Sequence, residues 1–226
     1  MKDSKSSLSS NQINSLMALY SSGQYEEAIV QIKSLNNLFP NVPLLFNLIG
    51  ACYKELGQLE GSVQMFKNAI NIKGDYAEAH FNLGAVHKLL SRDQDAVESY
   101  KKAIKILPNY PDAYNNLGTA LHDLGLLEEA IESLEWAIAY KSDFAEAHNN
   151  LGVMLQQLGR FNEAETSYKQ AIALKPDYAE AHNNFGNTLQ KLGRFNEAET
   201  SYKQAIALKP DYTETHLNLC ELLKTM

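Results

Sequence analysis

Apolar and small residues recur at three- and four-residue spacing along most of this chain, in segments of about a dozen residues. Between residues 145 and 158, five residues at this spacing share one helical face: Ala147, Leu151, Met154, Leu155 and Leu158. A second stripe, between 162 and 174, consists of Ala164, Tyr168, Ala171 and Ile172. Gly159 separates the two segments as a residue that can end a helix in the left-handed conformation, and Pro176 ends the second segment. The pattern predicts an all-α chain of paired amphipathic helices.

Glycines show that these helix pairs repeat every 34 residues. One series contains Gly50, Gly84, Gly118, Gly152 and Gly186, and a second contains Gly23, Gly57, Gly125, Gly159 and Gly193, with Ser91 in its one gap. A fixed period of this length indicates a stacked repeat architecture. The chain then divides into a polar tail (1–8), six repeats (9–42, 43–76, 77–110, 111–144, 145–178 and 179–212) and a remainder (213–226). We expect the remainder to be a C-terminal capping helix or a truncated seventh repeat. Positions within a repeat are called slots below.

The fifth and sixth repeats are nearly identical. They differ at only four of 34 slots: Leu151/Phe185, Val153/Asn187, Met154/Thr188 and Gln157/Lys191. Recent duplication explains this identity. Gly152 and Ala164 lack bulk, which predicts that the two helices of the repeat cross closely there. The aromatic residue that precedes each new repeat, such as Tyr178, is expected to wedge between neighbouring repeats.

The residues AEAHNNLG and LGRFNEAETSYKQAIALKPDY of the fifth repeat resemble the signature of the tetratricopeptide repeat, and the other repeats match many of the same slots. The resemblance spans about nine-tenths of the chain. It implies helix-turn-helix units stacked into a right-handed α-solenoid, with the first helix of each pair on the concave side. The first repeat departs most, because Leu16 replaces the crossing glycine. We expect this repeat to cap the N-terminal end.

Composition narrows the classes of function. The chain has 226 residues, 45% of them hydrophobic, and a net charge of -7, which argues against a nucleic-acid partner. No apolar run reaches the roughly 18 residues that a membrane span needs, so no membrane partner is expected. The N-terminus lacks the apolar core of a signal peptide. Cys52 and Cys220 are too few to form a disulfide framework, and we expect a cytoplasmic setting.

No constellation of catalytic, metal or cofactor residues is evident. Motifs for phosphate binding, paired CxxC ligands, HExxH and the nucleophile elbow are missing from the sequence, so we expect no enzyme activity, no metal and no cofactor. Four histidines recur every 34 residues: His80, His148, His182 and His216. Stacked helices lie about 8–10 Å apart, too far for such imidazoles to share one ion. The slot holds Phe46 and Tyr114 in other repeats, so packing is the favoured interpretation.

Asparagine forms the more informative series. The sixth slot holds Asn82, Asn116, Asn150, Asn184 and Asn218, and an asparagine precedes three of them at Asn115, Asn149 and Asn183. Asparagine is a poor helix former, so its repetition inside helices needs a reason. A carboxamide can pair with both groups of a peptide backbone. One interpretation is a surface that binds an extended peptide, with flanking selectivity residues Asn47, Thr119, Gln156, Gln190 and Lys191; the other is that the amides bond neighbouring repeats or water.

Two functions follow from these observations. The first is a non-catalytic scaffold for protein–protein interaction that binds an extended peptide segment of a partner. The sixth-slot asparagines also look most like the superhelix of the protein O-linked N-acetylglucosamine transferases, which hold peptide substrates in this way. That resemblance implies the alternative function, an N-terminal substrate-recruiting arm of a larger glycosyltransferase, sulfotransferase or methyltransferase whose catalytic domain is absent from this sequence.

Charged residues make one partner class unfavourable. Chaperone-adaptor members of the family clamp acidic C-terminal peptides with Lys and Arg on the first helices. Here the second slot is acidic in four repeats and in the remainder, at Glu78, Asp112, Glu146, Glu180 and Glu214, and the fifth and ninth slots carry no basic residue. The helix dipole accounts for most of these acids, but no carboxylate clamp remains. Acidic C-terminal chaperone peptides are therefore not expected as partners.

Trp136 is the only tryptophan, in a slot that is polar in the other repeats: Ser34, Asn68, Lys102, Gln170 and Gln204. It is therefore expected to face solvent on the convex side. Two interpretations stay open, a contact for a partner or a ring that lies flat against its own helix.

Overall fold

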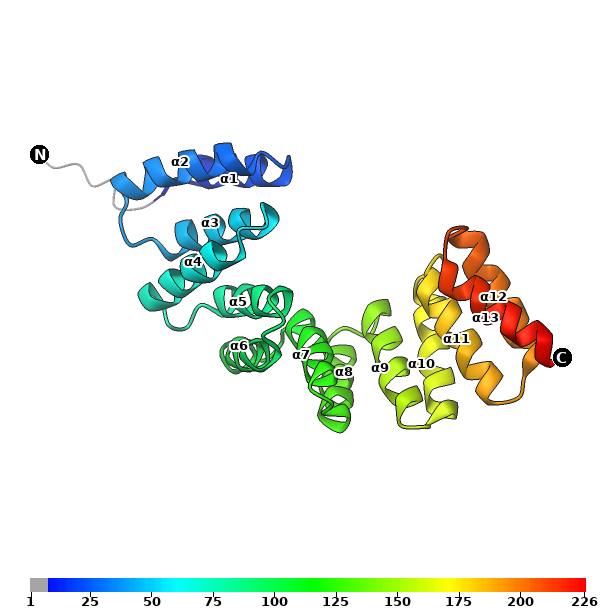
Figure 1. The fold of residues 1–226 in the computed structure, drawn as a ribbon. Helices are drawn as coiled ribbons and strands as arrows, with labels where there is room; N and C mark the ends of the chain where they lie inside the picture. The colour runs from blue at the N-terminus through cyan, green and yellow to red at the C-terminus, as the bar shows by residue number, and fades with distance from the viewer. Residues whose placement is uncertain (1–7) are drawn as a thin grey trace, which may run out of the picture. The chain divides into compact units, whose positions relative to one another are not determined.

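The computed structural model describes residues 8–226, and they form helices with no strand among them (Figure 1). The expected polar tail therefore lies almost wholly outside the described residues. The thirteen helices of this part are α1 (Ser10–Ser21), α2 (Tyr25–Leu38), α3 (Pro43–Glu55), α4 (Leu59–Ile72), α5 (Ala77–Leu89), α6 (Asp93–Ile106), α7 (Pro111–Asp123), α8 (Leu127–Tyr140), α9 (Ala145–Gln157), α10 (Phe161–Leu174), α11 (Ala179–Lys191), α12 (Phe195–Leu208) and α13 (Thr213–Thr225). The all-α prediction is confirmed, and each predicted repeat supplies one pair of helices.

The helices form two compact units, one ending at Pro108 and one beginning at Asn109. Three helix pairs, α1 to α6, make up the first unit, and the second contains three pairs and α13. Within each unit every helix packs on the next one, and most first helices of successive pairs also touch, as α9 touches α7 and α11. This nearest-neighbour packing is that of a helical-repeat solenoid. The sequence alone suggested one unbroken series of six repeats.

A left-handed residue makes the turn between the two helices of a pair. Gly159 has φ 73°, and its N–H bonds the carbonyl of Gln156 at 3.0 Å. The other four glycines of this series also have positive φ, as predicted for a helix stop, and Ser91 takes the same conformation with φ 56°. Serine has a Cβ and is strained in this region, so the third repeat has the least favourable turn of this kind.

The glycines of the other series allow the paired helices to cross. A Cβ added at Gly152 would lie 2.6 Å from the ring of Tyr168, closer than real Cβ atoms approach, and Gly186 stands in the same way against Tyr202. Both tyrosine side chains are fully buried. The predicted close crossing is confirmed, and the small residue on one helix is matched to a large ring on the other.

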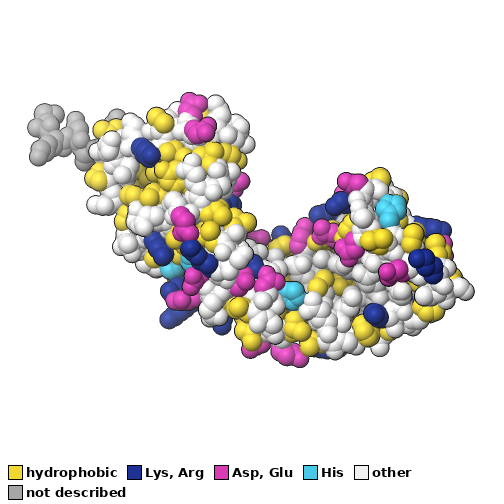
Figure 2. Space-filling model, viewed as in Figure 1, with side chains coloured by type: hydrophobic (Ala, Val, Ile, Leu, Met, Phe, Trp, Pro, Cys, Tyr) yellow, Lys and Arg dark blue, Asp and Glu magenta, His cyan; other side chains and the backbone are white. Residues whose placement is uncertain are grey.

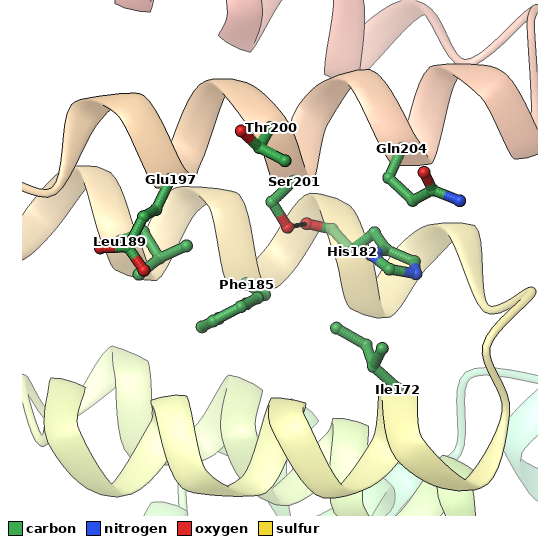
Figure 3. Close-up of a pocket in the computed structure, with 8 residues that line it drawn as sticks. All are labelled: Ile172, His182, Phe185, Leu189, Glu197, Thr200, Ser201 and Gln204. Atoms are coloured by element: carbon green, nitrogen blue, oxygen red, sulfur yellow. Dashed lines mark hydrogen bonds between the residues drawn. The ribbon is translucent and has the colours of Figure 1, made fainter.

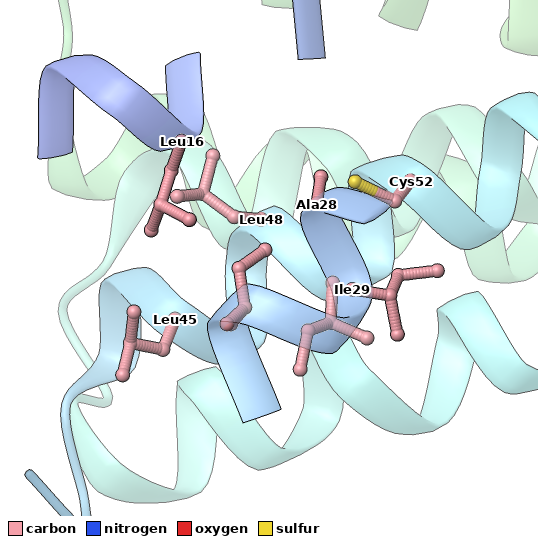
Figure 4. Packing of buried hydrophobic residues seen from close by; sticks show 8 residues of the cluster. Leu16, Ala28, Ile29, Leu45, Leu48 and Cys52 are labelled. Carbon is pink, nitrogen blue, oxygen red and sulfur yellow. The ribbon is translucent and has the colours of Figure 1, made fainter. Parts of the chain in front are cut away.

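In the first repeat, α1 and α2 cross without a glycine. Leu16 replaces the glycine and is buried, and Ile32 stands in the slot where later repeats have Phe66, Tyr100, Leu134, Tyr168 and Tyr202. In the first repeat a large side chain is therefore on the first helix, at Leu16, and Ile32 on the second helix is smaller than the rings of most later repeats. Leu16 belongs to a cluster with Ala28, Ile29, Leu45, Leu48 and Cys52 that joins the first pair to α3 (Figure 4).

Candidate functional site

Four of the five asparagines of the sixth slot bond the repeat before them. Each donates an N–H from Nδ2 to the Oδ1 of the fifth-slot asparagine one repeat earlier, 35 residues back: Asn82 to Asn47 (3.1 Å), Asn150 to Asn115 (3.0 Å), Asn184 to Asn149 (3.2 Å) and Asn218 to Asn183 (3.1 Å). First helices of successive repeats are therefore joined by amide pairs. The interpretation that these amides link neighbouring repeats is correct.

The two members of each pair differ in burial. The fifth-slot residues Asn115, Asn149 and Asn183 are buried, whereas the sixth-slot residues Asn150, Asn184 and Asn218 are half-buried. Side chains of the buried members serve mainly to join the repeats. The half-buried members remain partly exposed to solvent, so they can join the repeats and also bind a peptide.

Asn116 lacks this link. The residue 35 positions before it is Phe81, which has no amide, and Asn116 Oδ1 instead accepts a hydrogen bond from Asn115 Nδ2 at 3.3 Å. The amide pairs therefore operate within each compact unit, one in the first and three in the second.

Tyrosines that precede a repeat also reach the buried asparagines. The hydroxyl of Tyr178 bonds Asn149, and that of Tyr76 bonds Asn47. Burial raises the pKa of Tyr178 to about 12, although the bond from Asn149 opposes this shift. The predicted wedge between repeats is thus also a polar contact that satisfies a buried amide.

A polar hollow of about 540 Å³ opens beside the last amide pair of the second unit. Its walls come from α9, α11, α12 and α13, and it is lined by Gln156, Asn187, Gln190, Lys191, Phe195, Asn218, Glu221 and Thr225. Four of these residues, Gln156, Gln190, Lys191 and Asn218, are among those that the sequence assigned to peptide binding or its selectivity. Carboxamides dominate the wall, with one cationic, one anionic and one aromatic side chain around them.

Buried phenols hold the carboxamides in place. The Tyr202 hydroxyl lies 2.7 Å from Asn187 Oδ1 and 3.0 Å from Gln190 Oε1, and the Tyr168 hydroxyl donates to Gln156 Oε1 at 3.2 Å. Burial raises the pKa of Tyr202 to about 12, so the phenol remains a donor. Because the oxygens of both glutamines face these phenols, their NH2 groups are left as donors for a ligand.

Sequence reasoning missed four of the lining residues: Asn187, Phe195, Glu221 and Thr225. The sequence did contain a clue to Asn187, because this residue is one of the four differences between the fifth and sixth repeats. All four differences lie on first helices. Asn187 and Lys191 line the hollow, and a third, Thr188, donates to the lining residue Gln156 at 2.9 Å.

Comparison with models of known protein families shows which family the chain belongs to. A tetratricopeptide repeat profile matches residues 143–211, and a second profile of the same repeat matches residues 50–91, 89–125 and 120–159. The chain belongs to the tetratricopeptide repeat family. Proteins of this family are scaffolds for protein–protein interaction, and this chain is one of them. A comparison with curated proteins gives no match.

Solved structures of other tetratricopeptide repeat proteins have the same fold. MamA superposes with a TM-score of 0.68 at 24% identity over 76% of this chain and 94% of that one. YrrB, described as a tetratricopeptide repeat protein with an unusual peptide-binding site, gives 0.69 at 20% identity over 83% of this chain and 96% of that one. PilF of Pseudomonas aeruginosa gives 0.73 at 20% identity over 81% and 83%. At these identities the likeness concerns the fold.

A second hollow of the tetratricopeptide repeat stack, of about 440 Å³, is largely apolar (Figure 3). Ile172 of α10 and Phe185 and Leu189 of α11 form its floor, and its rim includes Thr200 and Gln204 of α12. Phe185 is the fourth difference between the fifth and sixth repeats. This hollow provides a natural comparison for the polar one, because it lies in the same repeat and differs in lining.

The repeated histidines have a structural role. In each of His80, His148, His182 and His216, Nε2 lies 2.9–3.1 Å from the backbone carbonyl six residues earlier, in the loop that enters the repeat. A carbonyl can only accept, so Nε2 carries the hydrogen. Within residues 8–226 no group of three or more His, Cys, Asp or Glu side chains is placed to hold a metal ion.

Acidic and basic side chains both lie on the surface of the described residues (Figure 2). Figure 2 shows Lys and Arg side chains scattered over the visible face of each unit, with no broad basic patch on that face. Across the described helices, none combines the length and the apolar character that a membrane crossing requires.

Proposed function

We propose that this tetratricopeptide repeat protein binds an extended segment of a partner protein along the first helices of its second unit, without catalysing a reaction. The proposed site consists of the polar hollow and the half-buried asparagines beside it. One observation carries the proposal. Two repeats that are otherwise nearly identical differ at four residues on their first helices, and two of those residues line the hollow.

The chemistry of the wall suits a peptide backbone. The NH2 groups of Gln156 and Gln190 can donate to carbonyls of the ligand, and Asn150 Oδ1, which accepts no bond from the described residues, can accept from a ligand N–H. Repeats stack about 10 Å apart and an extended chain rises about 3.3 Å per residue, so one repeat meets every third ligand residue. Amide recognition of this kind tolerates many ligand sequences.

Charged and aromatic side chains at the hollow supply selectivity. Lys191 and Glu221 bring opposite charges, and Phe195, which is 38% exposed, offers a ring. At the entrance of the first helices, Glu146 pairs with Lys175 at 3.3 Å and Glu214 accepts from Asn183 at 3.3 Å. We propose that the ligand is a cytoplasmic protein segment that carries both acidic and basic residues. Acidic C-terminal peptides are disfavoured, because the fifth and ninth slots of the first helices carry no Lys or Arg to clamp a carboxylate.

The experiment uses residues of the fifth repeat as replacements in the sixth. Twelve-residue peptides are selected from a random library on the whole chain, and their affinity is measured for the wild type, for Asn187→Val with Lys191→Gln, and for Phe185→Leu as the matched control. The proposal expects at least a tenfold loss of affinity in the double variant and little change in the control. Equal losses in both variants, or unchanged affinity in the double variant, would refute it.

The alternative function, a recruiting arm of a larger transferase, uses the same surface. Each of the thirteen described helices falls within the 34-residue register of the repeats. The peptide experiment therefore tests the binding surface for both functions.

A further inference from the structure

The fourth repeat carries an aromatic cluster that the proposed peptide site does not use. Trp136 and Tyr140 on α8 and Tyr114 on α7 have ring centroids 5.7–6.4 Å apart and planes within 30° of one another. A hydrogen bond between Tyr114 and Tyr140 holds two of the rings, and burial together with Tyr140 raises the pKa of Tyr114. Trp136 stacks on Tyr140 of its own helix, yet it remains 47% exposed, and Tyr140 remains 39% exposed.

Two exposed carboxylates continue the same face of α8. Glu129 lies two turns before Trp136 and Glu132 one turn before it, at the spacings that place residues on one helix face. Neither side chain has an ion-pair partner among the described residues. Helix α8 itself contains no Lys or Arg between Leu127 and Tyr140.

Equivalent slots of the fifth and sixth repeats show what is special about this face. There the counterparts of Glu129 are neutralised: Arg160 holds Glu163 with two bonds of 2.7–2.8 Å, and Arg194 holds Glu197 with two of 2.6–2.7 Å. In the fourth repeat the arginine slot holds Leu126, which leaves Glu129 unpaired.

Four further replacements at this face act in the same direction as Leu126. Relative to both later repeats, a histidine slot holds Tyr114, a threonine slot holds Glu132, a glutamine slot holds Trp136 and a leucine slot holds Tyr140. Every one of these five replacements removes a cation, adds an anion or adds an aromatic ring. Aromatic faces and carboxylates together attract guanidinium and ammonium groups.

We propose that the face formed by Glu129, Glu132, Trp136, Tyr140 and Tyr114 binds a basic segment of a partner protein. One arginine or lysine side chain stacks on the exposed rings, and a second pairs with the unpaired glutamates. This site is centred on α8 and shares no residue with the polar hollow, so it stands independently of the proposed peptide site.

Trp136 makes the test direct because it is the only tryptophan in the chain. A peptide of three arginines alternating with glycines is titrated into the whole protein to millimolar concentration while tryptophan fluorescence is recorded. The expected result is a saturable change with the arginine peptide, weaker at higher salt, and no change with the same peptide carrying neutral citrulline.

Variants that copy the later repeats complete the test. Leu126→Arg and Glu132→Thr should each weaken binding about two- to fivefold, as expected for exposed ion pairs and cation–π contacts. Binding of a labelled peptide to Trp136→Gln should fall similarly, and Gln170→Ala in the fifth repeat should leave it unchanged. Equal binding of the citrulline peptide, unaltered affinity in Leu126→Arg, no fluorescence change, or a change on raising the protein concentration alone would overturn the proposal.

Discussion

Asn150 on α9 donates a hydrogen bond from Nδ2 to Oδ1 of Asn115 on α7 across 3.0 Å. Asn115 is buried and Asn150 is half-buried, so one amide pair lies both inside the repeat stack and at its surface. Because the same pair recurs one repeat later, a residue type that the sequence associates with ligand binding also joins successive repeats.

Loss of the buried amide should cost more stability than loss of the half-buried one. Asn115→Ala is expected to lower the free energy of unfolding by about 1–3 kcal/mol, because Asn150 loses its acceptor and a cavity remains. Asn150→Ala should cost about 1 kcal/mol. Urea unfolding measures both, and Asn162→Ala at an exposed position serves as control. Similar losses in Asn115→Ala and Asn162→Ala would contradict the assignment.

Gly152→Ala tests the close crossing of α9 and α10. The new Cβ would lie 2.6 Å from the Tyr168 ring, which cannot retreat easily from its fully buried position. Overpacking of this kind should lower the free energy of unfolding by about 1–3 kcal/mol.

Gly74→Ala is the matched control for that change. Nothing lies within 4 Å of a Cβ at Gly74, and its φ is not positive. We expect its melting temperature to stay within a few degrees of the wild type. A larger loss in Gly74→Ala than in Gly152→Ala would show that crowding is not the cause.

Ser91→Gly should stabilise the third repeat. Ser91 has φ 56°, whereas the other five turns of this kind have glycine at φ 71–77°. Removing the Cβ relieves about 1–2 kcal/mol of strain, offset by the extra freedom of glycine in the unfolded chain. We expect a net gain of about 0.5–1 kcal/mol in thermal unfolding. Gly159→Ala should show a loss, and a stabilised Gly159→Ala would argue against the explanation.

Stability should fall at alkaline pH. Burial raises the pKa of Tyr202 to about 12 from an unfolded value of 10, so the folded state favours the protonated phenol. This contribution is fully present below pH 10 and is lost as the pH rises through about 12. Urea midpoints measured across this window should decline less steeply in Tyr202→Phe, once its lower starting stability is taken into account. Parallel curves would contradict the role of Tyr202.

The 34-residue period allowed the fold to be predicted from the sequence. Spacing of the glycines located each helix pair, and the lack of bulk at Gly152 and Ala164 predicted the close crossing of the two helices, although the contact of Gly152 with Tyr168 is seen only in the structure. The division after Pro108 could not be predicted in this way, because it depends on three-dimensional contacts that the 34-residue register does not reveal.

Parts of the candidate site were predictable for the same reason. The sequence identified Gln156, Gln190, Lys191 and Asn218 by their slots, and all four line the polar hollow. Glu221 and Thr225 of α13 were missed, because the approach of that helix depends on packing. The sequence could not show whether the asparagines bond one another or a ligand, because a carboxamide can pair equally well with either.

The central claim is that a peptide binds at the polar hollow of the second unit. Side-chain amide signals, followed by NMR while a library-selected peptide is added to the whole chain, test it most directly. The account predicts that the NH2 signals of Gln156, Gln190 and Asn218 shift with one common dissociation constant and that the buried amide of Asn115 does not. A shift of the NH2 signal of Gln204 at the apolar hollow, with the signals of Gln156, Gln190 and Asn218 unchanged, would contradict it.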